Sequence, residues 1–128
     1  MRSILTILCL ALTGCAVNIQ RPELPALADA TVKDLCANYA ADRSIQVRAE
    51  LERRAEFSAD EWRRIKRGQT NPSGMREAVL WCAWGLPGDF GDITQTPTGA
   101  TRYRYAQEFA GGVDIVVKDG VVVDWTMF

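Results

Sequence analysis

Apolar residues between residues 31 and 84 recur at a spacing close to 3.6, which predicts amphipathic helices. Side chains that can cap a helix precede these segments, namely Thr31, Ser44, Ser58 and Ser73. The most complete of these starts is Ser58-Ala59-Asp60-Glu61, a capping box, and Gly68 follows it as a stop. The pattern therefore predicts helices at residues 31–41, 44–54, 58–66 and 75–84.

The last of these segments has no polar side chain between Ala78 and Trp84. A helix at a protein surface shows one apolar stripe, so a helix without a polar face must be covered on more than one side. Packing against the other helices would satisfy this requirement. A partner protein or lipid that covers Trp81 and Trp84 would satisfy it as well, so both tryptophans are candidates for partner binding.

A Gly- and Asp-rich loop is expected at residues 88–99, and after it the period changes to two, which indicates strands. We expect a sheet at about residues 100–128 with three antiparallel strands, joined by loops at residues 110–112 and 118–120. This register keeps the apolar residues on one face. It pairs Phe109 with Val113, Ile115 with Val123, and Val117 with Val121.

The same register aligns three carboxylates, Glu108, Asp114 and Asp124, across the outer face of the sheet. Like charges directly opposite each other destabilise a sheet. Either a bound cation compensates them, or strand twist and solvent keep them apart. We favour separation by solvent and keep the three residues as a candidate cation site.

The N-terminus carries an apolar segment, residues 4–12, that is shorter than the about 20 residues needed to span a bilayer. It ends at Leu12-Thr13-Gly14-Cys15, which resembles the lipobox of bacterial lipoprotein signal peptides. The resemblance implies removal of residues 1–14 as a signal peptide and lipidation of Cys15. In such lipoproteins an aspartate after the cysteine favours the inner membrane. Ala16 stands there instead, so we expect a lipid-anchored protein of the outer membrane that faces the periplasm.

Residues 15–30 contain Pro22 and Pro25 and show no apolar period, so they are expected to form a lipidated tether. Residues 31–128 are expected to form a single domain, since this length supports one core and not two. Cys36 and Cys82 lie within it. An oxidising compartment favours a disulfide between them, and two buried free thiols are the alternative.

The composition restricts the chemistry that the protein can perform. The chain has no histidine, which excludes a Ser-His-Asp triad, a Cys-His pair and the commonest metal ligand. Its 15 basic and 16 acidic side chains give a net charge of −1, so charge gives no support for nucleic-acid binding. We therefore expect no enzyme, no cofactor besides the lipid on Cys15, no nucleic-acid partner and no small-molecule substrate.

Residues 66–128 carry a series of short motifs. They are Gly74-Met75, Val79, Gly85-Leu86-Pro87, Arg102-Tyr103-Arg104-Tyr105 and Asp119-Gly120. In this order they resemble the SmpA/OmlA family of BamE-like lipoproteins. The resemblance implies a two-layer α+β fold, BamE-like or BLIP-like, with N-terminal helices packed on one face of a three-stranded antiparallel sheet. It also implies contact with other envelope proteins and no catalysis.

Two functions agree with these features. The first is a non-catalytic adapter in envelope integrity or outer-membrane protein assembly. The second is a periplasmic inhibitor or ligand-binding module that grips a partner with its sheet or its tryptophan-rich helix. Both predict an anchored protein that binds another envelope protein. The candidate partner-binding residues are Trp81, Trp84, Arg102 and Arg104.

Overall fold

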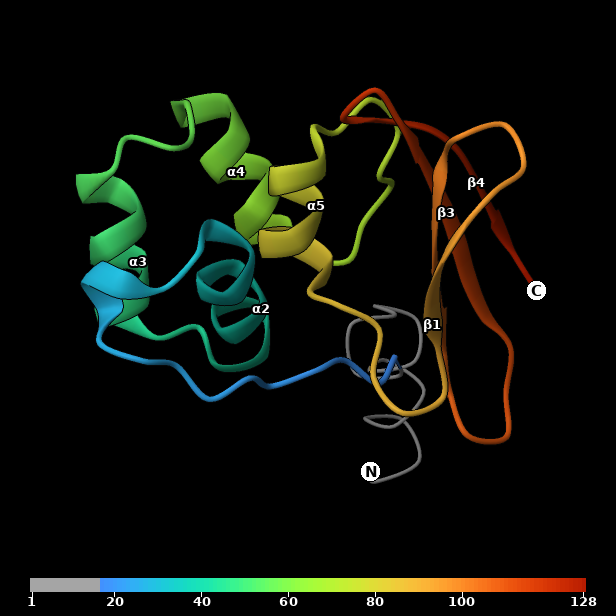
Figure 1. Ribbon diagram of the computed structural model, residues 1–128, viewed down its shortest axis with the longest axis horizontal. Helices are drawn as coiled ribbons and strands as arrows, with labels where there is room; N and C mark the ends of the chain where they lie inside the picture. Colours follow the sequence, from blue (N-terminus) through green and yellow to red (C-terminus); the bar gives the residue numbers. More distant parts are fainter. Residues whose placement is uncertain (1–16) are drawn as a thin grey trace, which may run out of the picture.

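The helices lie on one face of a four-stranded antiparallel sheet (Figure 1). The computed structural model describes residues 17–128. The expected α+β class is confirmed, whereas the expected number of three strands is wrong. The elements are the 3-10 helix η1 (Leu27–Asp29), the helices α2 (Val32–Asp42), α3 (Ile45–Arg53), α4 (Ala59–Arg67) and α5 (Glu77–Trp84), and the strands β1 (Asp92–Gln95), β2 (Thr101–Ala106), β3 (Gly112–Lys118) and β4 (Val121–Met127).

Helices α2, α3 and α4 begin where the sequence predicts because their caps form. Thr31, Ser44 and Ser58 each accept a hydrogen bond from the backbone N–H three residues further on. The Glu61 side chain accepts in return from the Ser58 N–H, which completes the capping box. Gly68 then ends α4 with a φ of 70°, a left-handed value that favours glycine.

Helix α5 begins at Glu77 rather than at Met75, and Ser73 does not cap it. The residues before it pair instead with the start of β4. Val122 donates to the Met75 carbonyl and Glu77 donates to the Gly120 carbonyl, both at 2.8 Å. This pairing keeps Arg76 extended after a turn at Gly74, so the helix starts later and part of the β4 edge is covered.

Strand β1 lies in the segment expected to be a loop. It pairs with β2 at one edge of the sheet, where Ile93 stands opposite Tyr103. Ile93 is the only apolar residue among the four of this strand, so the segment offers no alternation to detect. Short, polar strands are common at sheet edges because they resist pairing with another chain.

The loop between β2 and β3 comprises residues 107–111 rather than 110–112. Tyr105 pairs with Val113, so the expected pairing of Phe109 with Val113 is wrong. Phe109 lies in the loop with 94% of its surface exposed. Phe109 continues the alternation of apolar residues in the sequence, although the strand itself ends at Ala106. The pattern therefore predicts a longer β2 than the structure has.

Asp119 and Gly120 form a two-residue turn, with φ values of 52° and 78°, in place of the expected three-residue loop. Left-handed values at both positions are those of a type I′ hairpin. The two-residue turn places Val117 opposite Val122, so the expected pair of Val117 is wrong. An irregularity between Val116 and Val117 then leaves Val123 without a partner in β3, so the expected pair of Ile115 is wrong as well. The observed pairs are Lys118 with Val121, Val117 with Val122, Val116 with Asp124, and Ile115 with Trp125.

Residues 17–30 are packed on the domain and do not form the expected tether. Ile19 pairs with Pro87, and Gln20 donates to the Leu86 carbonyl at 2.8 Å. Farther along, Arg21 forms an ion pair with Asp42 at 3.0 Å. The side chains of this segment that pack against the core are Val17, Ile19, Leu24 and Leu27. The prediction of a tether is therefore wrong for residues 17–30, while Cys15 and residues 1–14 lie outside the described residues.

Helix α5 lies at the centre of the core, between α2 and α4 on one side and the sheet on the other (Figure 1). Its lack of a polar face is therefore explained by burial within the domain. No helix within residues 17–128 is long and apolar enough to cross a membrane. The core includes Leu35, Leu51, Ile65, Val79, Leu80, Tyr105 and Ile115.

Candidate interaction surface

One face of the sheet is left uncovered by the helices (Figure 1). Side chains alternate between the two faces of a strand, and Tyr103, Tyr105 and Ile115 are buried on the helix side. The residues that alternate with these three along β2 and β3 point to the uncovered face of the sheet. We call this surface the open face and define it by Arg102, Arg104, Asp114, Val116, Lys118, Asp124, Thr126 and Phe128.

An arginine–carboxylate pair is fixed on the open face. Arg104 donates from Nε to Asp114 Oδ1 at 2.8 Å and from Nη2 to Oδ2 at 2.9 Å. Such paired, parallel hydrogen bonds fix the planes of both groups. The guanidinium also lies over the Phe128 ring, 4.5 Å from its centroid. The hydrogen bonds from Arg104 lower the pKa of Asp114, so its carboxylate stays ionised at neutral pH.

The expected row of three carboxylates does not form. Glu108 lies in the 107–111 loop, Asp114 stands opposite Arg104 and Thr126, and Asp124 stands opposite Val116. Within residues 17–128 no three His, Cys, Asp or Glu side chains are grouped so that they could hold a metal ion. The expected alignment of Glu108, Asp114 and Asp124 is therefore wrong, and with it the reason for keeping these three residues as a candidate cation site.

Arg102 differs from Arg104 in having no ion-pair partner within the described part of the chain. It stands opposite Val116 and is half-buried. Its Nε atom is buried and makes no hydrogen bond to any described residue. One arginine of the open face is thus neutralised within the domain, and the other can still pair with a carboxylate of a partner.

The two tryptophans of α5 are placed differently. Trp84 is 3% exposed, its ring lies 5.2 Å from that of Tyr105, and its Nε1 donates to the Thr70 carbonyl. Trp84 belongs to the core, so its prediction as a partner-binding residue is wrong. Trp81 is half-buried and donates from Nε1 to the Tyr103 hydroxyl at 3.0 Å. It contributes mainly to the contact between α5 and β2.

The phenols of Tyr103 and Tyr105 are expected to make the fold sensitive to alkaline pH. Burial raises the pKa of both above the ordinary 10.0, and for Tyr103 a hydrogen bond donated to the Glu77 carboxylate raises the pKa further. The unfolded chain ionises both phenols near pH 10, whereas the folded chain keeps them protonated. The contribution of the two phenols to the free energy of unfolding is therefore fully present below about pH 10 and declines above it. At about pH 11 the loss is about 1.4 kcal/mol for each phenol.

Urea unfolding between about pH 8 and about pH 11 measures this loss. The double variant Y103F/Y105F provides the control, because it cannot ionise at either position. It should show a clearly flatter decline than the parent protein. A decline of the same slope in both proteins would mean that other groups cause the alkaline sensitivity.

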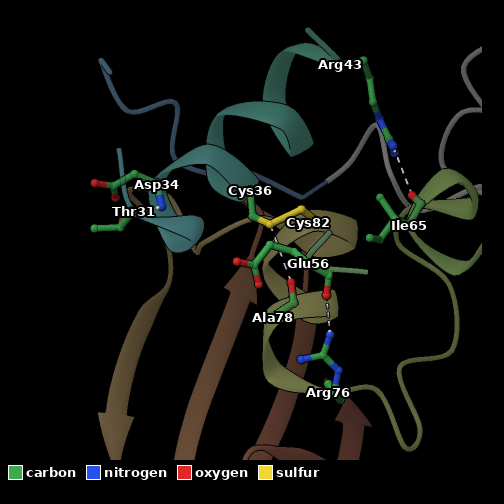
Figure 2. Close-up of a disulfide and its surroundings, with 9 residues drawn as sticks. All are labelled: Thr31, Asp34, Cys36, Arg43, Glu56, Ile65, Arg76, Ala78 and Cys82. Atoms are coloured by element: carbon green, nitrogen blue, oxygen red, sulfur yellow. Dashed lines mark hydrogen bonds between the residues drawn. A yellow bond between two sulfur atoms is a disulfide. The ribbon is translucent and has the colours of Figure 1, made fainter. Parts of the chain in front are cut away.

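Cys36 and Cys82 form a disulfide that joins α2 to α5 (Figure 2). Both residues are fully buried, and the expected disulfide is confirmed in place of two free thiols. Arginines bridge neighbouring segments in the same region. Arg43 donates to the Ile65 carbonyl at 3.1 Å, and Arg76 donates to the Glu56 carbonyl at 3.0 Å (Figure 2). The helix layer is thus connected covalently and by side-chain to backbone hydrogen bonds.

Comparisons with family models, with curated proteins and with solved structures found no match. The resemblance of residues 66–128 to the SmpA/OmlA family therefore rests on the sequence motifs. The lipobox likewise stays a prediction, because Cys15 lies outside the described residues. The open face is the candidate site that the structure itself provides.

Proposed function

We propose that the protein is an outer-membrane lipoprotein, anchored by a lipid on Cys15 and facing the periplasm. Its role is that of a non-catalytic adapter in envelope integrity or outer-membrane protein assembly. The lipobox at residues 12–15 supports the anchor, and the SmpA/OmlA-like motifs support the adapter role. The observation that carries the binding role is the open face, a sheet surface with no described element packed on it.

The side chains of the open face suit a protein partner. Protein interfaces are enriched in arginine and aromatic residues, and Arg104 and Phe128 form a stacked pair of this kind. Because Asp114 already orders Arg104, little side-chain entropy remains to be lost when a partner binds. We infer a partner that presents a carboxylate to Arg102 and an apolar surface to Val116.

A second candidate function, a periplasmic inhibitor or ligand-binding module, uses the same face. The tryptophan-rich helix α5 is disfavoured as the partner-binding surface of such a module because Trp84 is buried. The two functions differ in the protein that is bound. An adapter binds a structural or assembly component of the envelope, whereas an inhibitor binds an enzyme and lowers its activity.

Site-specific crosslinking in intact cells tests the proposed binding surface. A photoreactive residue at Thr126, which is exposed on the open face, should form an adduct with one envelope protein. The same residue at Ile45, which is 81% exposed on α3, is the matched control and should form none. The variant R102E should lose the Thr126 adduct because it reverses the charge offered to the partner.

Equal adducts from Thr126 and Ile45 would argue against a role for the open face. The intact mass of the purified protein tests the anchor separately. A chain that begins at Cys15 and carries the mass of attached acyl groups agrees with the proposal. A chain with an unmodified Cys15 contradicts the proposed address.

A further inference from the structure

Exposed apolar side chains gather at one end of the sheet. Strands β1 and β3 begin at this end and β2 and β4 finish there, since every neighbouring pair is antiparallel. Three of the four phenylalanines of the chain lie exposed at this end. We call it the phenylalanine end and define it by Phe90 before β1, Phe109 in the 107–111 loop, and Met127 and Phe128 at the end of β4, with exposed fractions of 45%, 94%, 68% and 52%.

The described chain starts at the same end of the sheet. Asn18 donates to the carbonyl of Ala106, which immediately precedes the loop that carries Phe109. The Asn18 carbonyl accepts from the Gly88 N–H at 3.0 Å, and its side-chain Oδ1 accepts from the Asp89 N–H at 3.0 Å. Figure 1 shows this start, in blue, near the lower end of the sheet. Asn18 therefore fixes the first described residues beside the segments that carry Phe90 and Phe109.

Only one residue, Ala16, separates Cys15 from the docked Val17. Two residues of extended chain span at most about 7 Å, which is close to the depth that an interfacial segment reaches into a bilayer. A lipid on Cys15 would therefore keep the domain close to the membrane. It would also restrict which side of the domain faces the membrane.

We propose that the lipid on Cys15 seats the phenylalanine end of the sheet on the bilayer, with Phe109 in the interfacial region. This inference rests on the proposed lipidation of Cys15. It makes the 107–111 loop a second membrane contact beside the lipid. Burial of this additional apolar surface adds to the attachment that the lipid provides.

The charges near this end indicate which lipid it fits. Asp89 and Glu108 lie beside Phe90 and Phe109 in the sequence, so anionic headgroups are not attracted there. The contact therefore depends on apolar burial and needs only zwitterionic lipid. The competing membrane contact is the basic last turn of α4, with Arg64, Lys66 and Arg67, which would need anionic lipid and would turn the helix layer to the membrane.

The phenylalanines themselves provide the test, because Phe57 lies in the helix layer with its ring 5.4 Å from that of Trp62. The lipidated protein is produced with para-fluorophenylalanine and reconstituted in phosphatidylcholine nanodiscs, with and without a spin-labelled lipid. Fluorine NMR then reports each phenylalanine, with assignments from single leucine substitutions. We expect the Phe109 signal to be lost in the presence of the spin label, the Phe90 and Phe128 signals to weaken, and the Phe57 signal to persist.

Two results would overturn the inference. One is a Phe57 signal that is lost as fully as that of Phe109, which would place the helix layer on the membrane. The other is persistence of all the signals in a sample whose intact mass includes the lipid. An intact mass without the lipid is a different failure, because it overturns the proposed anchor and with it the inference.

Discussion

Loss of the Cys36–Cys82 disulfide is expected to lower the free energy of unfolding by about 4 kcal/mol. The two cysteines are 46 residues apart, and loop-closure entropy for a loop of this length predicts roughly that value. Small domains are stable by only about 5–15 kcal/mol, so the loss would remove a large part of the total. The melting temperature should fall by roughly 15 °C for a domain of this size.

Chemical and thermal unfolding of C36A, C82A and C36A/C82A measures this effect. Either single substitution breaks the disulfide, so the two single variants and the double variant should lose nearly the same stability. The oxidised parent protein is the reference, and its fully reduced form should resemble the double variant. Single losses that add up to the loss of the double variant would mean that the two cysteines act independently.

The helices could be predicted from the sequence because their signals are local. Thr31, Ser44 and Ser58 each satisfy a backbone N–H within the first turn, so the cap and the helix lie in one short segment. The start of α5 was misplaced for the opposite reason. Residues 74–76 pair with β4, more than 40 residues further along the chain, and this long-range pairing overrides the local cap at Ser73.

The antiparallel arrangement of the sheet could be predicted from the sequence, but the residue pairs between its strands could not. The bulge reverses the alternation at the start of β4, because Val122 is buried whereas Val121 and Val123 are exposed. All three residues are valines, so the residue pattern does not show this reversal. The candidate site depended on this register. With the observed loop, Asp114 stands opposite Arg104 and forms an ion pair, whereas the expected loop placed it opposite other carboxylates. The 107–111 loop thus separates Asp114 from Glu108, and the turn with its bulge separates Asp114 from Asp124, so an arginine–carboxylate pair stands where a row of carboxylates was expected.

The docking of residues 17–30 could not be predicted because the apolar side chains of this segment follow neither a helix nor a strand period.

The docking of this segment affects how the open face is oriented relative to the membrane. A flexible tether would let the open face point in any direction, but the docking of Asn18 would couple the face to the position of the proposed anchor on Cys15. With the strand ends on the bilayer, the open face would stand beside the membrane, where other envelope proteins can reach it.

Substitution of Trp84 by alanine is expected to lower the free energy of unfolding by about 3–5 kcal/mol, the usual cost of removing a large buried aromatic side chain. The change removes the ring contact with Tyr105 and leaves the Thr70 carbonyl without the Nε1 donor. Trp81, three residues earlier on the same helix, is the matched control. It is only half-buried, so W81A should cost about 1–2 kcal/mol.

Urea unfolding of W84A, W84F and W81A measures the difference. W84F keeps most of the buried surface and should retain the fold with an intermediate loss of stability. Because Trp84 lies in the core and away from the open face, a folded W84F protein should still form the crosslink from Thr126. A W84A protein as stable as W81A would contradict the expected contribution of Trp84 to the core. Loss of the crosslink in folded W84F would assign Trp84 to partner binding.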